Sequence, residues 1–238
     1  ADRVTIAVTE WAPLFHVTPA SAWVDHSKTL GSALYVADVL RVFIADERVA
    51  AATFFKLNEP SFLGLLGMRR GEWIPNATYF AFQLYTEHFG TRVVASRRES
   101  PAFDSQQAGI VPAMKSIPLL ESVASMSEDG ERLYVMLVNK SLDQSADVSL
   151  SIQGFEPAGG KAHLLTGPSP DANTGAELPR IPGIRWAEQV NVDASARHFD
   201  RGSPAEVRLV TAPIAGAGRS FAYRLPPHSA ASLELRRR

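Results

Sequence analysis

The chain has 238 residues, of which 45% are hydrophobic, and its 24 basic residues nearly balance 25 acidic ones. This balance gives no electrostatic basis for binding nucleic acid, and no apolar run approaches the roughly 20 residues that cross a bilayer. The absence of cysteine excludes disulfides, thiolate metal sites and cysteine nucleophiles. We therefore expect a protein that binds neither nucleic acid nor membranes. The composition leaves its compartment open between cytoplasm, periplasm and secretion.

A short apolar strand is predicted at the start of the chain, and it ends in a carboxylate and an indole. Residues 4–8 are mostly small or β-branched, as in a strand covered on both faces. Glu10 and Trp11 follow, and Pro13 cannot continue a central ladder. Catalytic groups of a (β/α) barrel lie at the carboxyl ends of its strands. Glu10 is therefore a candidate glycosidase carboxylate beside a platform for a sugar ring, and the alternative is a glutamate on a solvated loop.

The first 90 residues alternate between strand and helix patterns. Ser27 is a candidate N-cap for an amphipathic helix over residues 30–44, where apolar residues recur every three or four positions. Residues 49–55 predict a second buried strand. After a loop rich in glycine, Pro75 suits the first turn of a second helix, which Gly90 ends. Such a β-α-β-α order builds parallel sheets.

From about residue 91 onward the sequence predicts strands and no helix. Residues 146–152 and 231–236 alternate between apolar and polar side chains. Residues 133–138 are apolar on both faces, which favours a central strand, and residues 206–211 add another. Short strands separated by Gly, Pro and Asn turns predict an antiparallel β-sandwich.

The predicted fold class is α/β plus all-β, with domains at residues 1–90 and 91–238. Two β-α units cannot close a barrel, which needs eight strands and about 250 residues. Alone, two parallel strands would leave apolar faces and unpaired edges exposed. We therefore expect residues 1–90 to be the C-terminal end of a (β/α)8 TIM barrel, its last two β-α units. A longer chain or a partner would supply the other strands.

The chain resembles the C-terminal half of glycoside hydrolase family 51, the α-L-arabinofuranosidases. Thr9-Glu10-Trp11 resembles the motif around the nucleophile of that family, on strand seven of the barrel. The other segments that carry the resemblance, in order along the chain, are residues 29–38, 78–90, 164–167, 172–174 with Pro179, and 225–235.

The resemblance implies a retaining glycoside hydrolase that removes terminal α-L-arabinofuranosyl residues from polysaccharides or oligosaccharides. Glu10 would attack the anomeric carbon and form a glycosyl-enzyme that water hydrolyses. The family takes its acid/base from strand four, which this sequence lacks, so we expect the isolated chain to be inactive. Trp11, Trp23 and Lys56 would contact the sugar, although many members have Gln in place of Lys56, and the two tryptophans fit ordinary loop packing equally well. The family also implies a homo-oligomer.

Two further patterns offer weaker candidates for chemistry. Asn58-Glu59-Pro60 resembles an acid/base motif of related barrels, but it follows the Glu10 strand instead of preceding it. We interpret Glu59 as a loop carboxylate or one that lines an outer subsite. No two histidines have metal-ligand spacing, and His16 and His26 are expected on surface loops. The sequence therefore predicts no metal and no cofactor.

The alternative from another class is a non-catalytic β-sandwich that serves as an accessory or structural module. Its N-terminal 90 residues would then pack on the sandwich or on a partner chain. Carbohydrate binding by the sandwich alone is not favoured, because such binding needs a row of exposed aromatic side chains. The predicted sandwich has Trp186 as its single tryptophan.

Overall fold

The computed structural model describes residues 4–13, 23–58, 63–107, 111–176 and 204–238. In its N-terminal part the elements are β1 (Ile6–Trp11), η1 (Trp23–Lys28), α1 (Leu30–Ala45), β2 (Val49–Phe54), β3 (Leu66–Arg69), β4 (Glu72–Pro75) and α2 (Ala77–Glu87). The strands that follow are β5 (Arg92–Val94), β6 (Ala102–Phe103), β7 (Ile117–Pro118), β8 (Leu120–Met126), β9 (Arg132–Asn139), β10 (Ala146–Ser151), β11 (Pro157–Thr166), β12 (Arg208–Pro213), β13 (Ser220–Leu225) and β14 (Ser229–Arg237). None of the described helices is long and apolar enough to cross a membrane.

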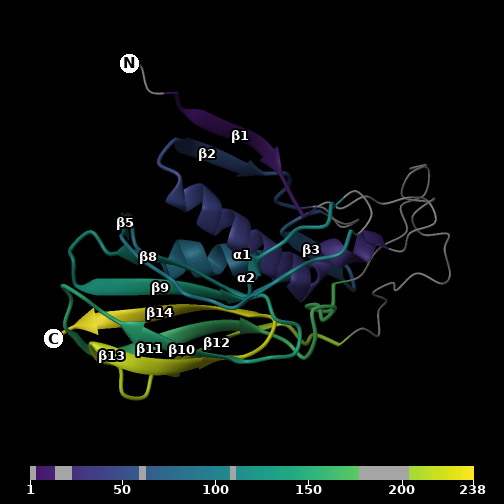
Figure 1. The fold of residues 1–238 in the computed structure, drawn as a ribbon. Coiled ribbons are helices and arrows are strands. Elements are labelled where there is room, and N and C mark those ends of the chain that lie inside the picture. The colour runs from purple at the N-terminus through teal and green to yellow at the C-terminus, as the bar shows by residue number, and fades with distance from the viewer. Residues whose placement is uncertain (1–3, 14–22, 59–62, 108–110, 177–203) are drawn as a thin grey trace, which may run out of the picture.

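The elements stack in layers, and the helices lie between the first strand pair and the large sheet (Figure 1). β1 and β2 pair in parallel, which confirms the predicted strand–helix–strand order of this region. The large sheet has the strand order β12-β11-β14-β9-β8-β5, and all its neighbours are antiparallel. The antiparallel pair β10–β13 covers the face of this sheet that points away from the helices. The predicted central strand is therefore confirmed as β9.

The start of α1 differs from the prediction. Ser27 lies inside the 3-10 turn η1, and Thr29 is the N-cap of the helix. The Thr29 hydroxyl accepts a hydrogen bond from the backbone N–H of Ser32 at 3.3 Å, as an N-cap side chain should. The choice of Ser27 was wrong because a 3-10 turn separates it from the first α-helical residue.

A β-hairpin, instead of a loop, connects β2 to α2. Its strands β3 and β4 are joined by Arg70 and Gly71, which both have positive φ, at 52° and 86°. Positive φ at both central residues is the mark of a type I′ turn, whose twist matches that of a hairpin. Pro75 therefore ends β4, and its predicted place in the first turn of the helix was wrong because Asn76 is the N-cap of α2.

Two apolar clusters lie on the two faces of the large sheet. The cluster on the helix side joins α1 and α2 to side chains of β8, β9, β11 and β14, and the other cluster joins the sheet to β10 and β13. The alternation of residues 231–236 assigns Ser232 and Glu234 to a polar face of β14. The structure buries both residues, because α2 covers that face. β14 is thus a strand with two buried faces.

The end of α2 is bound tightly to the sheet. The backbone N–H of Gly90 donates to the Ser125 hydroxyl at 2.8 Å, and the Ser232 hydroxyl donates to the carbonyl of His88. A Cβ atom on Gly90 would lie 2.3 Å from the carbonyl oxygen of Met126. A glycine is therefore needed here because two backbones approach closely, whereas the sequence suggested a helix stop.

A network of charged side chains lies between α1 and the sheet. The Glu121 carboxylate of β8, with 3% of the residue exposed, accepts a hydrogen bond from Arg98 at 2.5 Å. Arg41 of α1 and Lys140 lie 3.6 and 3.5 Å from the same carboxylate, and both also pair with Asp38 at 2.7 Å. Glu121 therefore ties α1 to the sheet through cations on both sides.

We predict that Glu121→Gln lowers the free energy of unfolding by about 2–3 kcal/mol. Removing one partner of a buried ion pair costs about 3–5 kcal/mol, and the cost is smaller here because the cations are partly exposed. Glu99→Gln is the matched control, since Glu99 pairs with Arg97 on an exposed surface. Urea denaturation of both variants checks this, and equal losses would contradict it.

Candidate functional site

Glu10 and Lys56 lie at the same end of the parallel strand pair, where the carboxyl ends of both strands meet. Glu10 is the last residue but one of β1, and Lys56 follows β2 by two positions. The backbone N–H of Phe55 donates to the carbonyl of Trp11 at 2.9 Å, so the two strand ends stay side by side. Both side chains are exposed, and the Lys56 ammonium lies 5.4 Å from the centre of the Phe55 ring. The structure thus brings two of the predicted site residues to the carboxyl end of the strand pair.

The backbone of β1 is irregular where Glu10 lies. Val8 pairs with Ala52 and Trp11 pairs with Phe54, so β1 has one more residue than β2 between these pairs. An extra residue of this kind makes a bulge, and bulges are common beside active sites, where they change the direction of a side chain. The sequence missed this feature, because no glycine or other turn residue marks it.

Trp11 packs against the helices beneath the strand pair. Its ring makes edge contacts with Phe43 of α1 and Phe54 of β2, at centroid distances of 5.3 and 5.2 Å, and lies 5.9 Å from Phe82 of α2. Glu10 is exposed, whereas the Trp11 ring packs on the helices, so the two side chains lie on different faces of the strand end. The indole therefore supports the strand end that carries the carboxylate. Stacking of Trp11 on a sugar stays a prediction.

His26 holds the segment that follows Trp11. The Nε2–H of His26 donates to the carbonyl of Pro13 at 2.8 Å, and its own carbonyl accepts hydrogen bonds from the hydroxyls of Thr29 and Ser32, both at 2.6 Å. Burial lowers the pKa of His26, which favours the neutral ring. The expected surface position was wrong, because His26 links the end of β1 to the start of α1. Spacing along the sequence gave no signal for this contact.

Other predicted residues are only partly covered by the structure. Trp23 begins η1, and its side chain lies outside what the structure describes. Glu59, His16, Pro179 and Trp186 lie outside the described residues. Their expected roles therefore stay predictions.

Several solved glycoside hydrolases contain this fold. The chain is similar to the α-L-arabinofuranosidase of Thermotoga maritima in an arabinose complex, with a TM-score of 0.72 and 20% identity, over 98% of this chain and 43% of that one. The thermostable GH51 α-L-arabinofuranosidase of Thermotoga petrophila RKU-1 matches with a TM-score of 0.72 and 19% identity, over 97% of this chain and 43% of that one. The GH51 arabinofuranosidase of Xanthomonas axonopodis pv. citri matches with a TM-score of 0.66 and 20% identity, over 98% of this chain and 41% of that one. The chain thus spans less than half the length of each of these structures.

The sequence itself identifies the family. The profile described as the α-L-arabinofuranosidase C-terminal domain matches residues 9–200, and the chain belongs to this family. The comparison with curated proteins found no match. The resemblance to the C-terminal half of family 51 enzymes is therefore confirmed. The matched region runs across residue 90, and the domain boundary placed there stays a prediction.

We predict that Trp11→Ala destabilises the chain by about 3 kcal/mol, because it removes a large ring from the aromatic cluster. Trp11→Phe should cost about 1 kcal/mol. The Nε1 atom of Trp11 is buried and has no hydrogen-bond partner among the described residues, so phenylalanine loses no such bond there. Chemical denaturation measures both effects. Equal losses in the two variants would contradict this account, because a phenyl ring would then support the strand end no better than a methyl group.

Proposed function

We propose that this chain is the C-terminal part of a retaining α-L-arabinofuranosidase and that Glu10 is its nucleophile. The observation that carries the proposal is the place of Glu10, which is exposed at the carboxyl end of a strand in a parallel pair, at a bulge. Membership of the α-L-arabinofuranosidase C-terminal domain family gives this carboxylate a glycosidase context. Carboxyl ends of strands are where parallel barrels carry their catalytic groups.

We propose that the strand pair belongs to a larger TIM barrel. Parallel strands are normally covered on both faces, and here the helices cover one face. Apolar side chains at the two ends of the pair are exposed, with Val4 at 76% and Leu57 at 64%. The remaining barrel strands, from a longer chain or from another copy in a homo-oligomer, would cover these side chains. The units β1–α1 and β2–α2 would then be the last two of the barrel.

The acid/base of this mechanism would come from that remaining part. In a retaining enzyme it lies about 5–5.5 Å from the nucleophile. Asp38 is occupied by Arg41 and Lys140 on the side of α1 that faces the sheet, and Asp46 pairs with Arg48 before β2, at the opposite end of the strand pair. Both carboxylates are therefore engaged in ion pairs away from the carboxyl ends of β1 and β2.

The other residues at this end of the strand pair would bind the sugar. The Lys56 ammonium would donate hydrogen bonds to hydroxyl groups of a terminal arabinofuranosyl residue, and Trp23 would offer a ring for stacking. Trp11 and the contact between His26 and Pro13 would keep the end of β1 in place. Glu59 would line an outer subsite. The substrate would be an arabinose-containing polysaccharide or oligosaccharide.

The first experiment is native mass spectrometry of the protein from its natural source. A polypeptide about twice as long, or a second chain of barrel size, is the expected result. A native species of this chain alone would contradict the catalytic proposal. It would favour the accessory module, whose helices and sheet already share one apolar core.

We predict that Glu10→Gln lowers kcat of the complete enzyme on an aryl α-L-arabinofuranoside by more than about a thousandfold, because an amide cannot form the glycosyl-enzyme. Glu47→Gln is the matched control, since Glu47 is exposed before β2, at the opposite end of the strand pair. It should leave kcat unchanged. This chain alone should show no activity. Hydrolysis by the chain alone that Glu10→Gln abolishes would disprove the need for a second part, and full activity of the complete Glu10→Gln enzyme would disprove the nucleophile.

A further inference from the structure

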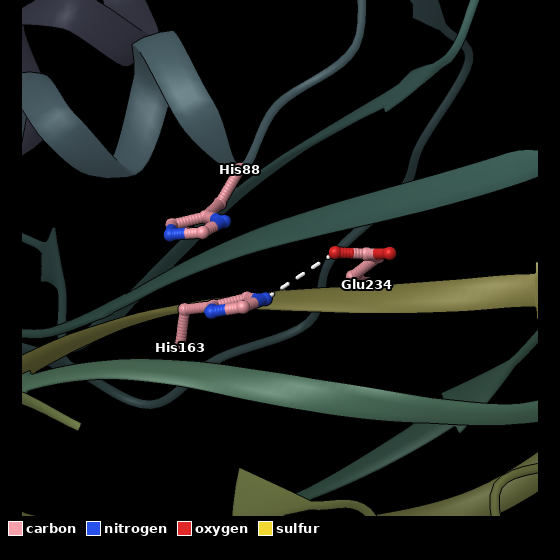
Figure 2. Close-up of side chains that lie close together, drawn as sticks. All are labelled: His88, His163 and Glu234. Carbon is pink, nitrogen blue, oxygen red and sulfur yellow. Dashed lines mark hydrogen bonds and ion pairs between the residues drawn. The ribbon is translucent and has the colours of Figure 1, made fainter. Parts of the chain in front are cut away.

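Two histidines and a glutamate from three different elements meet beside the end of α2 (Figure 2). His88 is the C-cap residue of α2, His163 lies in β11 and Glu234 lies in β14. One ligand atom from each side chain lies within 4.8 Å of the others. His163 and Glu234 are buried, and His88 is half-buried, so the cluster has one side open to solvent.

Hydrogen bonds fix the orientation of the His163 ring. Its Nδ1 atom lies 2.9 Å from the hydroxyl of Thr211, on the neighbouring strand β12. Its Nε2 atom lies 3.3 Å from Oε2 of Glu234. If Nδ1–H donates to Thr211, the lone pair of Nε2 faces a lone pair of the carboxylate. That arrangement leaves room for a cation between the two atoms, whereas in the other tautomer Nε2–H donates to Glu234 and Nδ1 accepts from the Thr211 hydroxyl. A hydrogen bond from the second ring nitrogen is also what orients most metal-binding histidines.

His88 offers a second imidazole at the same place. Its ring stacks on that of His163, with centroids 3.5 Å apart and planes inclined by 7°. Its carbonyl accepts a hydrogen bond from Ser232 of β14, so the backbone is fixed while the ring lies at the open side. Burial and the neighbouring His163 lower the pKa of His88.

We propose that His88, His163 and Glu234 form a binding site for a divalent transition-metal ion, of which zinc is the best match. Zinc takes imidazole and carboxylate ligands at about 2.0–2.2 Å, so neighbouring donor atoms around it lie about 3.4 Å apart. The Nε2–Oε2 distance of 3.3 Å between His163 and Glu234 already has this value. The His88 ring completes the set by turning out of its stack. Three protein ligands leave a fourth position for water.

The charges around Glu234 are compatible with this site. Arg132 and Arg236 lie 3.9 and 3.4 Å from Oε1, whereas Oε2 faces His163. Oε1 of Glu234 thus pairs with the guanidinium groups, and Oε2 would bind the metal. The two nearby cations weaken the attraction for a positive ion, so the site should bind zinc less tightly than one without them.

The metal would cross-link the end of α2 to two strands of the sheet. Its ligands join the helix layer to β11 and β14 at the point where Gly90 and Ser125 already hold the helix end. Zinc would therefore stabilise the folded state, because it binds the assembled site and not the separated side chains. The sequence predicted no metal, since His88, His163 and Glu234 are far apart along the chain and only the fold unites them.

The test is a titration of the chelator-treated chain with zinc chloride. Isothermal titration calorimetry measures the binding, and thermal unfolding with and without zinc measures the stability. We expect a zinc ion at the cluster and a rise in the unfolding temperature. His163→Gln should weaken this binding by at least about tenfold and abolish the rise. Cobalt(II) should give the visible absorption of a four-coordinate ion, and magnesium, which prefers oxygen ligands, should produce neither effect.

Two further variants keep the test decisive. Glu131→Gln changes an exposed carboxylate that pairs with Arg237, and it should bind zinc as the unchanged chain does. His88→Gln alters the half-buried ligand and serves if His163→Gln does not fold, as judged by circular dichroism. Zinc binding that is unchanged in the histidine variants would overturn the proposal. So would the absence of zinc binding in the unchanged chain, which would show that a proton alone joins His163 to Glu234.

Discussion

The packing of α1 and α2 on the six-stranded sheet is the interaction on which the rest of the structure depends. Small side chains line this interface, among them Ala33 and Ala37 of α1, Ala81 of α2 and Ala230 of β14, all fully buried. Their size lets backbones approach closely, and the Tyr85 hydroxyl joins the helices by donating to the carbonyl of Ala37 at 2.8 Å. The strand pair that carries the candidate nucleophile lies on the far side of these helices (Figure 1). The position of that carboxylate is therefore set through the helices by the sheet.

Polar groups complete this interface at two places. Under α1, Glu121 and Asp38 share Arg41 and Lys140, and because broken ion pairs are costly in a buried place, this network resists sliding of the helix over the sheet. At the end of α2, the hydrogen bond from the Ser232 hydroxyl and the stacking of His88 on His163 likewise hold the helix against the sheet. An apolar cluster lies between the helices and the sheet, and these polar contacts help to determine how each helix lies on it.

Periodicity predicted only part of this fold, because β5, β8, β11 and β13 were not among the predicted strands, and its other failures have local causes. The strands that became β1, β2, β9, β10 and β14 and both helices follow from side-chain patterns, since burial of one or two faces leaves a direct trace in the sequence. The hairpin at Arg70 was missed because a positive φ at arginine has no compositional signal. The polar face of β14 gave no sign of burial under α2. At the candidate site, the sequence identified Glu10 and Lys56 at strand ends, whereas the bulge and the contact of His26 with Pro13 depend on tertiary structure.

The close approach at Gly90 bears on whether the sheet could be separated from the helices before it. A sandwich that can be transferred between proteins needs a polar outer surface and a flexible connection. Here the backbone of Gly90 lies against that of Met126, and the face of the sheet beneath it is shaped for two particular helices. Recombination at this junction would join a sheet to helices that do not fit it. The C-terminal sheet and the helices before it therefore form one packed unit.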